Sequence, residues 1–117
     1  MARRTKGIEE YDLHKRGMRA DDALARLERI VSLERSRGEG VFAVVTGYGS
    51  TGGTSIIKDA VLKQCATYLR QYHIRGYIDG EKACDFLSEE ALNFPALCEL
   101  PREALHIPNP GVVYIAV

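Results

Sequence analysis

The chain has 117 residues, 45% hydrophobic and 27% charged, enough for one domain whose core needs no disulfide or metal. Its sixteen basic and sixteen acidic side chains cancel, which argues against a dedicated non-specific DNA binder, so any nucleic-acid site must be a local patch. No apolar run approaches the ~20 residues of a membrane helix, and none follows the basic N-terminus, so we expect a cytoplasmic protein without a membrane partner.

In chain order, the sequence predicts strands that alternate with helices after a short basic leader. Tyr11 and Leu13 alternate with Asp12 and His14, as in a half-buried strand. Apolar residues at helical spacing predict two long helices, and continuous apolar runs predict buried strands. The expected elements are a disordered leader over 1–8, a strand over 9–14, a helix over 18–37, a strand over 41–45, a helix over 55–72 and a strand over 74–78.

Residues 79–110 are an insertion before a final apolar strand over 111–117. Residues 81–93 could form a helix whose inward side chains would be Ala83, Phe86, Leu87 and Leu92. Four prolines break the rest of the insertion into short pieces. Its apolar side chains could cover an edge strand, or form a contact with a protein partner or a second copy of the chain.

Strands linked through helices predict parallel pairing with right-handed crossovers. With only two main helices, an α/β two-layer sandwich is favoured over a doubly wound sheet. We therefore expect a single domain over 9–117, with the order β-α-β-α-β-(helical insertion)-β.

Asp12 and His14 form the first of two polar motifs that follow predicted strands. Because side chains alternate along a strand, both point away from Tyr11 and Leu13, toward the face that helices would leave uncovered. A carboxylate beside an imidazole can set its tautomer and raise its pKa, which gives a general base or a grip on a ribose or phosphate. Taken alone, such a pair is more typical of ordinary surface hydrogen bonds.

The glycine-rich loop over 46–54, between a strand and a helix, is the second motif. Its four glycines let backbone N–H groups converge near a helix N-terminus, which predicts an anion site, with a simple flexible turn as the alternative. The loop resembles a P-loop, but Gly53 replaces the lysine, and no apolar strand is expected to end in an aspartate that could hold Mg²⁺. We therefore expect neither nucleotide hydrolysis nor a nucleotide cofactor. Since parallel strands end at one sheet edge, the two motifs should meet there.

Together the motifs resemble the Smr (small MutS-related) domain family. The resemblance rests on D-L-H at 12–14, an Ala- and Leu-rich first helix, T-G-Y-G at 46–49 after the second strand, and an apolar last strand. It covers 9–78 well and 111–117 loosely. It implies a mixed four-stranded sheet with an antiparallel last strand, like the C-terminal domain of translation initiation factor three. Some family members are endonucleases that nick DNA or cleave RNA, and others are binding modules.

The resemblance also implies roles for individual residues. Asp12 and His14 would be catalytic, activating a water or a ribose 2′-hydroxyl, while the loop holds the scissile phosphate. Tyr48 occupies a position that is often basic in the family and could stack on a base, and Lys58 stands where the family has an arginine. The expected phosphate- or nucleic-acid-binding residues are Thr46, Gly47, Tyr48, Gly49, Ser50, Lys58, Lys15 and Arg16.

The sequence thus predicts a DNA- or RNA-binding domain that acts as an endonuclease, or alternatively a non-catalytic module for nucleic acid or a protein. No metal or other cofactor is expected. Cys65, Cys84 and Cys98 match no zinc or redox spacing, and Asp12 and His14 have no third ligand at a recognisable spacing.

Overall fold

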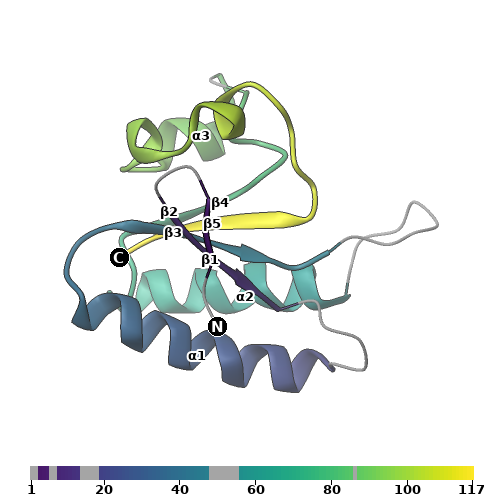
Figure 1. Cartoon of the computed structure of the whole chain (residues 1–117), viewed down its shortest axis with the longest axis vertical. Coiled ribbons are helices and arrows are strands. Elements are labelled where there is room, and N and C mark those ends of the chain that lie inside the picture. Colours follow the sequence, from purple (N-terminus) through teal and green to yellow (C-terminus); the bar gives the residue numbers. More distant parts are fainter. Residues whose placement is uncertain (1–2, 6–7, 14–18, 48–55, 86) are drawn as a thin grey trace.

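The computed structural model describes residues 3–5, 8–13, 19–47, 56–85 and 87–117. Two long helices lie between strands, and a segment of short helices precedes the last strand (Figure 1). The elements are β1 (Arg3–Thr5), β2 (Ile8–Asp12), α1 (Ala20–Ser36), β3 (Val41–Val45), α2 (Ile56–Arg70), β4 (Gly76–Asp79), α3 (Glu89–Asn93), the 3₁₀ helices η1 (Leu97–Glu99) and η2 (Arg102–Leu105), and β5 (Val112–Ala116). Within these ranges, no helix has the length and apolar character needed to span a bilayer.

The described strands form one mixed sheet in the order β1-β2-β3-β5-β4. β2 and β3 are parallel, whereas β5 lies between β3 and β4 and is antiparallel to both. The strands β2, β3 and β4 therefore run in one direction, and their carboxyl ends lie at the same sheet edge as the start of β5. The expected α/β class and mixed sheet are confirmed.

β1 was not expected, because residues 1–8 have the composition of a loose leader. In the structure, Arg3–Thr5 pairs antiparallel with β2 and adds a fifth strand, and Ile8 already belongs to β2. Such a short strand is held in the sheet by backbone hydrogen bonds, which do not depend on the residue types and so could not be predicted from composition. Residues 3–5 and 8 therefore belong to the sheet rather than to a disordered leader.

α1 and α2 cover one face of the sheet (Figure 1). Tyr11 and Leu13 point into this layer and are 4% and 0% exposed, as their alternation with Asp12 predicts. They meet side chains that recur every three or four residues along α1, namely Ala23, Leu27, Ile30 and Val31. Each large side chain so buried contributes about 1.5–3 kcal/mol, and this layer is the sandwich that the sequence predicts.

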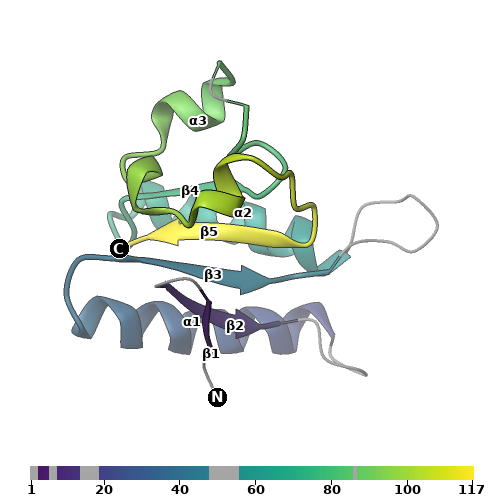
Figure 2. The ribbon, with the colours of Figure 1, turned by 45° about the horizontal axis from the view of Figure 1, so that its top comes forward.

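The opposite face of the sheet is covered by the segment over 80–110, which lies above β4 and β5 (Figure 2). Ala43, Ile78 and Tyr114 point to this side and are buried. They pack against apolar side chains of the segment, chiefly Ala83, Ala91, Phe94, Ala96, Leu100 and Ala104. Strands β3 and β5 are thus covered on both faces, which explains their unbroken apolar sequences.

The helix expected over 81–93 is mostly absent. The structure has only α3, which begins where the Ser88 hydroxyl accepts the backbone N–H of Ala91 at 3.1 Å. Upstream, Gly80 is tied to β5, since its N–H donates to Val112 O at 2.8 Å, so the chain turns instead of coiling. Leu87 and Leu92, expected to point inward, are 89% and 71% exposed.

Candidate functional site

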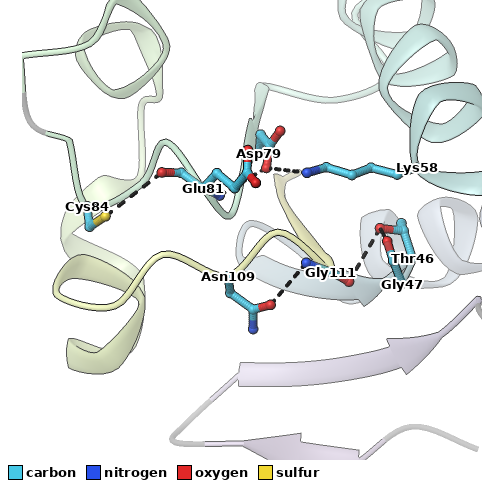
Figure 3. Close-up of polar contacts among 8 residues, drawn as sticks. All are labelled: Thr46, Gly47, Lys58, Asp79, Glu81, Cys84, Asn109 and Gly111. Carbon is cyan, nitrogen blue, oxygen red and sulfur yellow. Dashed lines mark hydrogen bonds and ion pairs between the residues drawn. The ribbon is translucent and has the colours of Figure 1, made fainter. Parts of the chain in front are cut away.

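Polar residues gather at the sheet edge where β2, β3 and β4 end and β5 begins. We call this region the strand-end edge; its described residues are Asp12, Thr46, Gly47, Asp79 and Gly111, and Lys58 reaches it from α2 (Figure 3 shows all but Asp12). The carboxyl ends of parallel strands are where ligands bind in open α/β sheets. The edge is therefore the first place to look for a site.

Asp12 ends β2 beside the end of β3. It pairs in register with Val45, and the next residue donates its N–H to Val45 O at 2.8 Å. The Asp12 backbone is also held from α1, because Arg26 Nε donates to Asp12 O at 3.2 Å. The Asp12 side chain is exposed while its neighbours Tyr11 and Leu13 are buried, so it lies outside the helix-covered core on a backbone that is held in place.

Thr46 and Gly47 begin the glycine-rich loop from a fixed base. Thr46 is fully buried, and the backbone N–H groups of Thr46 and Gly47 donate to the same carbonyl, Gly111 O, at 2.8 and 3.2 Å. Gly47 has a φ of +69°, a left-handed conformation that favours glycine. The chain is thus turned away from β3 at a defined point, next to Asp12.

The turn at Thr46 and Gly47 is supported by a close contact between the residue that follows β4 and the residues that precede β5. Asn109 Oδ1 accepts the N–H of Gly111 at 3.1 Å, and the N–H of Asn109 donates to Gly80 O at 3.1 Å. A Cβ at Gly80 would lie only 2.3 Å from Asn109 O, so no larger residue fits there without a backbone shift. Gly80 and Asn109 therefore support the carbonyl that holds Thr46.

Lys58 and Asp79 form a largely buried ion pair at the same edge. Lys58 Nζ lies 2.9 Å from Asp79 Oδ1, and the two side chains are only 6% and 19% exposed. The same carboxylate oxygen accepts the N–H of Glu81 at 2.9 Å. The ammonium of Lys58 thus joins the first turns of α2 to the end of β4, while its expected contact with phosphate stays a prediction.

Several of the expected site residues lie outside the described residues. They are His14, Lys15 and Arg16 after β2, and Tyr48, Gly49 and Ser50 after Gly47. The structure therefore brings together Asp12, Thr46 and Gly47, and places Lys58 behind them on Asp79. Among the described residues, no three His, Cys, Asp or Glu side chains gather closely enough to hold a metal ion.

Sequence reasoning missed Asp79 at this edge. β4 does end in an aspartate, contrary to expectation, because the strand over 74–78 was taken to stop one residue too early. The sequence did contain a signal for Asp79, because this aspartate directly follows the strand residues Tyr77 and Ile78, as Asp12 directly follows Tyr11. The ion pair between Asp79 and Lys58 could not be predicted in this way, because the two residues are distant in the chain.

A second polar cluster joins β2 to the end of α1. The Tyr11 hydroxyl donates to the Glu34 carboxylate, and Arg37 Nη1 lies 3.2 Å from Glu34 and Nη2 3.8 Å from Glu9. Burial, followed by the hydrogen bond and charge of Glu34, raises the pKa of Tyr11 to about 12. The cluster lets Glu34 lie within the apolar stripe of α1, which is a structural role.

Compared with known proteins, the chain matches no family model, no curated protein and no solved structure.

Proposed function

We propose that this chain is an Smr-type domain that binds the sugar–phosphate backbone of DNA or RNA at the strand-end edge and cleaves it. The observation that carries the proposal is the placement of exposed Asp12 beside Thr46 and Gly47, on neighbouring parallel strands. A carboxylate that can take a proton thus stands next to a backbone turn that leads into a glycine-rich loop. The mixed sheet with an antiparallel β5 is compatible with what the sequence resemblance implies.

In the proposed reaction, Asp12 and His14 take the proton of the attacking water or ribose 2′-hydroxyl, and the nucleotide oxygen on the far side of the phosphorus leaves. Backbone N–H groups of the loop over 47–50 would hold the phosphate oxygens, with Lys15 and Arg16 adding positive charge and Tyr48 stacking on a base. We expect this activity in the cytoplasm, without a bound cofactor.

The test is cleavage of supercoiled plasmid and of single-stranded RNA by the purified chain. We expect Asp12→Asn and His14→Ala each to lower the cleavage rate at least about a hundredfold, the usual scale of general acid–base catalysis. Glu39→Gln is the matched control, because Glu39 is 82% exposed and precedes β3 at the opposite end of the sheet. Cleavage that survives both site substitutions unchanged would overturn the catalytic roles.

A binding module without catalysis is the second candidate function. It is favoured by the Lys58–Asp79 ion pair, which commits the one cation of α2 expected at the phosphate to a structural contact. In that case the chain would bind nucleic acid without cleaving it, and the affinity would fall as salt rises. Binding at low salt by wild type and Asp12→Asn alike, with no cleavage by either, would favour this candidate.

A further inference from the structure

β4 is an edge strand whose outer side carries unpaired backbone groups. In the described sheet it pairs with β5 alone. Gly80 N–H donates to Val112 O at 2.8 Å, which places Gly80 at a hydrogen-bonding position of this antiparallel pair. Because these positions alternate, Tyr77 and Asp79 turn their backbone N–H and C=O groups outward. Lys82 N–H closes off the Asp79 carbonyl at 2.8 Å, so the N–H and C=O of Tyr77 are left without a partner strand among the described residues.

The outward side of Gly76–Asp79, which we call the β4 edge, lacks the residues that usually keep an edge strand from pairing. Charged side chains and prolines are the common protection. The opposite edge strand, β1, contains Arg3 and Arg4. β4 has no proline, and its only charged side chain, Asp79, is bound to Lys58 at 2.9 Å. The β4 edge is therefore chemically suited to accept another strand.

A groove of about 480 Å³ is lined by all residues of the β4 edge. Because α2 packs on one face of β4 and α3 on the other, the groove has a wall from each layer. Leu62 and Leu69 of α2 form an apolar wall, and Leu69 is 40% exposed. Glu89, Glu90 and Asn93 of α3 form a polar wall. The groove thus leaves room beside β4 for a short stretch of extended chain.

The α3 wall brings negative charge to the groove. Glu89 and Glu90 are exposed, and neither forms an ion pair with any residue that the structure describes. The two cations that line the groove, Arg75 and Lys82, lie before and after β4, and Arg75 Nε already donates to Val117 O at 2.8 Å. Side chains of a strand alternate between its faces. A strand in the groove would therefore meet leucines on its α2 face and carboxylates on its α3 face.

We propose that the β4 edge binds an extended segment of a partner protein in which apolar residues alternate with lysine or arginine, independently of any nucleic acid at the strand-end edge. The segment would add a strand to the sheet through the backbone N–H and C=O of Tyr77. Its apolar side chains would contact Leu62 and Leu69, and its basic side chains Glu89 and Glu90. A groove walled on both sides admits a single strand, whereas a second copy of the chain would have to bring its own α2 and α3 into the same space.

The first test titrates the ¹⁵N-labelled full chain with the peptide acetyl-Lys-Val-Lys-Val-Lys-amide and follows amide chemical shifts. The matched control is acetyl-Glu-Val-Glu-Val-Glu-amide, which has the same backbone and valines but the opposite charge. The basic peptide should shift the amides of Tyr77, Asp79 and Leu69 and leave β2 unchanged. It should bind about tenfold more tightly than the acidic peptide, the combined scale of a few exposed ion pairs. Equal affinity for the two peptides, shifts centred outside the groove, or no binding at millimolar basic peptide would overturn the proposal.

The second test removes the backbone donor of the β4 edge. Tyr77→Pro takes away an N–H that points outward, which an edge strand tolerates, and Tyr77→Ala is the matched control because it also loses the ring but keeps the N–H. The proline variant should bind the basic peptide at least about fivefold more weakly than the alanine variant, the scale of one net hydrogen bond. Melting temperatures of both variants verify folding. Equal affinities in the two folded variants would contradict strand addition.

The third test separates the charges and the alternative occupant. Replacing Glu89 and Glu90 together with glutamine should weaken binding of the basic peptide at least about threefold, whereas Glu99→Gln, an exposed carboxylate on η1 outside the groove, should not. Equal affinity in these two proteins would contradict the assigned contacts, whatever the outcome of the cleavage assay. Sedimentation of the chain without peptide should show a monomer. A dimer that Tyr77→Pro dissociates and Tyr77→Ala does not would overturn the proposal and assign the β4 edge to a second copy.

Discussion

Lys58 is almost removed from water, and its ammonium group forms an ion pair with the carboxylate of Asp79. With Nζ 2.9 Å from Asp79 Oδ1, it ties the start of α2 to the end of β4. Such a pair adds little stability compared with apolar side chains, but removing one partner leaves a charge in a poorly solvated place. The pair therefore matters most for the geometry of the strand-end edge.

We expect Lys58→Met to lower the free energy of unfolding by up to about 3 kcal/mol, the lower end for buried pairs, because Asp79 keeps some contact with water. Lys63→Met is the control on the same helix, since Lys63 is exposed, and should change stability by no more than about 0.5 kcal/mol. Urea denaturation of both variants measures the difference. Adding Asp79→Asn to Lys58→Met should recover part of the loss, and equal stability of the two lysine variants would contradict the structural role of the pair.

Cys65 provides a test of burial through pH. Burial raises the pKa of its thiol from 9.0 to about 12, so the folded chain holds this proton at a pH where the unfolded chain has lost it. The resulting stability is complete below about pH 9 and is lost as the pH rises toward 12. Over that interval Cys65 should lower the free energy of unfolding by about 1.4 kcal/mol per pH unit.

The measurement is urea unfolding at about pH 9 and about pH 10, below most of the contribution from the buried tyrosines. Cys65→Ala should be less stable at each pH because of the space left behind, but its stability should fall less steeply than that of wild type. Cys98→Ala, an exposed thiol, should keep the wild-type slope. Identical slopes for all three proteins would show that Cys65 is not buried as described.

At the scale of single residues, the sequence predicts which side chains of a strand are buried better than it predicts which distant side chains form ion pairs. It assigned Tyr11 and Leu13 to the core and Asp12 to the opposite side, because strand geometry alone decides this. It expected Lys58 at a phosphate and not on Asp79, because an ion pair between a helix and a distant strand has no periodic signature. The positions of His14 and Tyr48 stay predictions.

α2 ends in a C-terminal capping motif whose left-handed position is occupied by a residue that is unusual there. His73 N–H donates to Tyr68 O at 2.9 Å and Tyr72 N–H to Leu69 O at 3.2 Å, which is the Schellman pattern of a helix C-terminus. The left-handed position of this motif is normally glycine, but here it is Tyr72, with a φ of +61°. The Tyr72 side chain is 90% exposed, so it gains almost no packing in return.

Tyr72→Gly should therefore raise the free energy of unfolding by about 0.5–1 kcal/mol, since relief of the left-handed strain exceeds the extra chain entropy of glycine. Thermal unfolding detects this as a higher melting temperature. Tyr72→Ala serves as the control, because alanine also removes the ring yet keeps a Cβ in the strained conformation. A glycine variant less stable than the alanine variant would contradict this account.

The segment over 80–110 shows where prediction of elements fails. Its apolar residues predicted a helix over 81–93, yet tertiary contacts decide the outcome, because Gly80 and Asn109 are bound to each other and to the start of β5. The long helices were predicted nearly to the residue, since α1 and α2 each present one continuous apolar stripe. The prolines did indicate correctly that short pieces would follow.

For the whole molecule, the order of elements predicted the direction of the strands that matter for function. Helical connections between β2, β3 and β4 required a common direction, which places Asp12 and Thr46 at one edge. The cover on the second face and the strand β1 were not predictable in the same way, because neither leaves a periodic pattern. Beneath that cover, a cavity of about 290 Å³ is lined by residues of β2, β3 and β5 and by residues between 101 and 109.

The central claim, that nucleic acid binds at the strand-end edge, is tested most directly by amide chemical-shift mapping. The ¹⁵N-labelled chain is titrated at low salt with single-stranded RNA and with branched DNA. We predict shifts at Leu13, Thr46, Gly47 and Gly111 that diminish as salt is raised, and none at Gly40, at the opposite end of β3. Shifts centred on Gly40, or no shift with either nucleic acid, would contradict the claim.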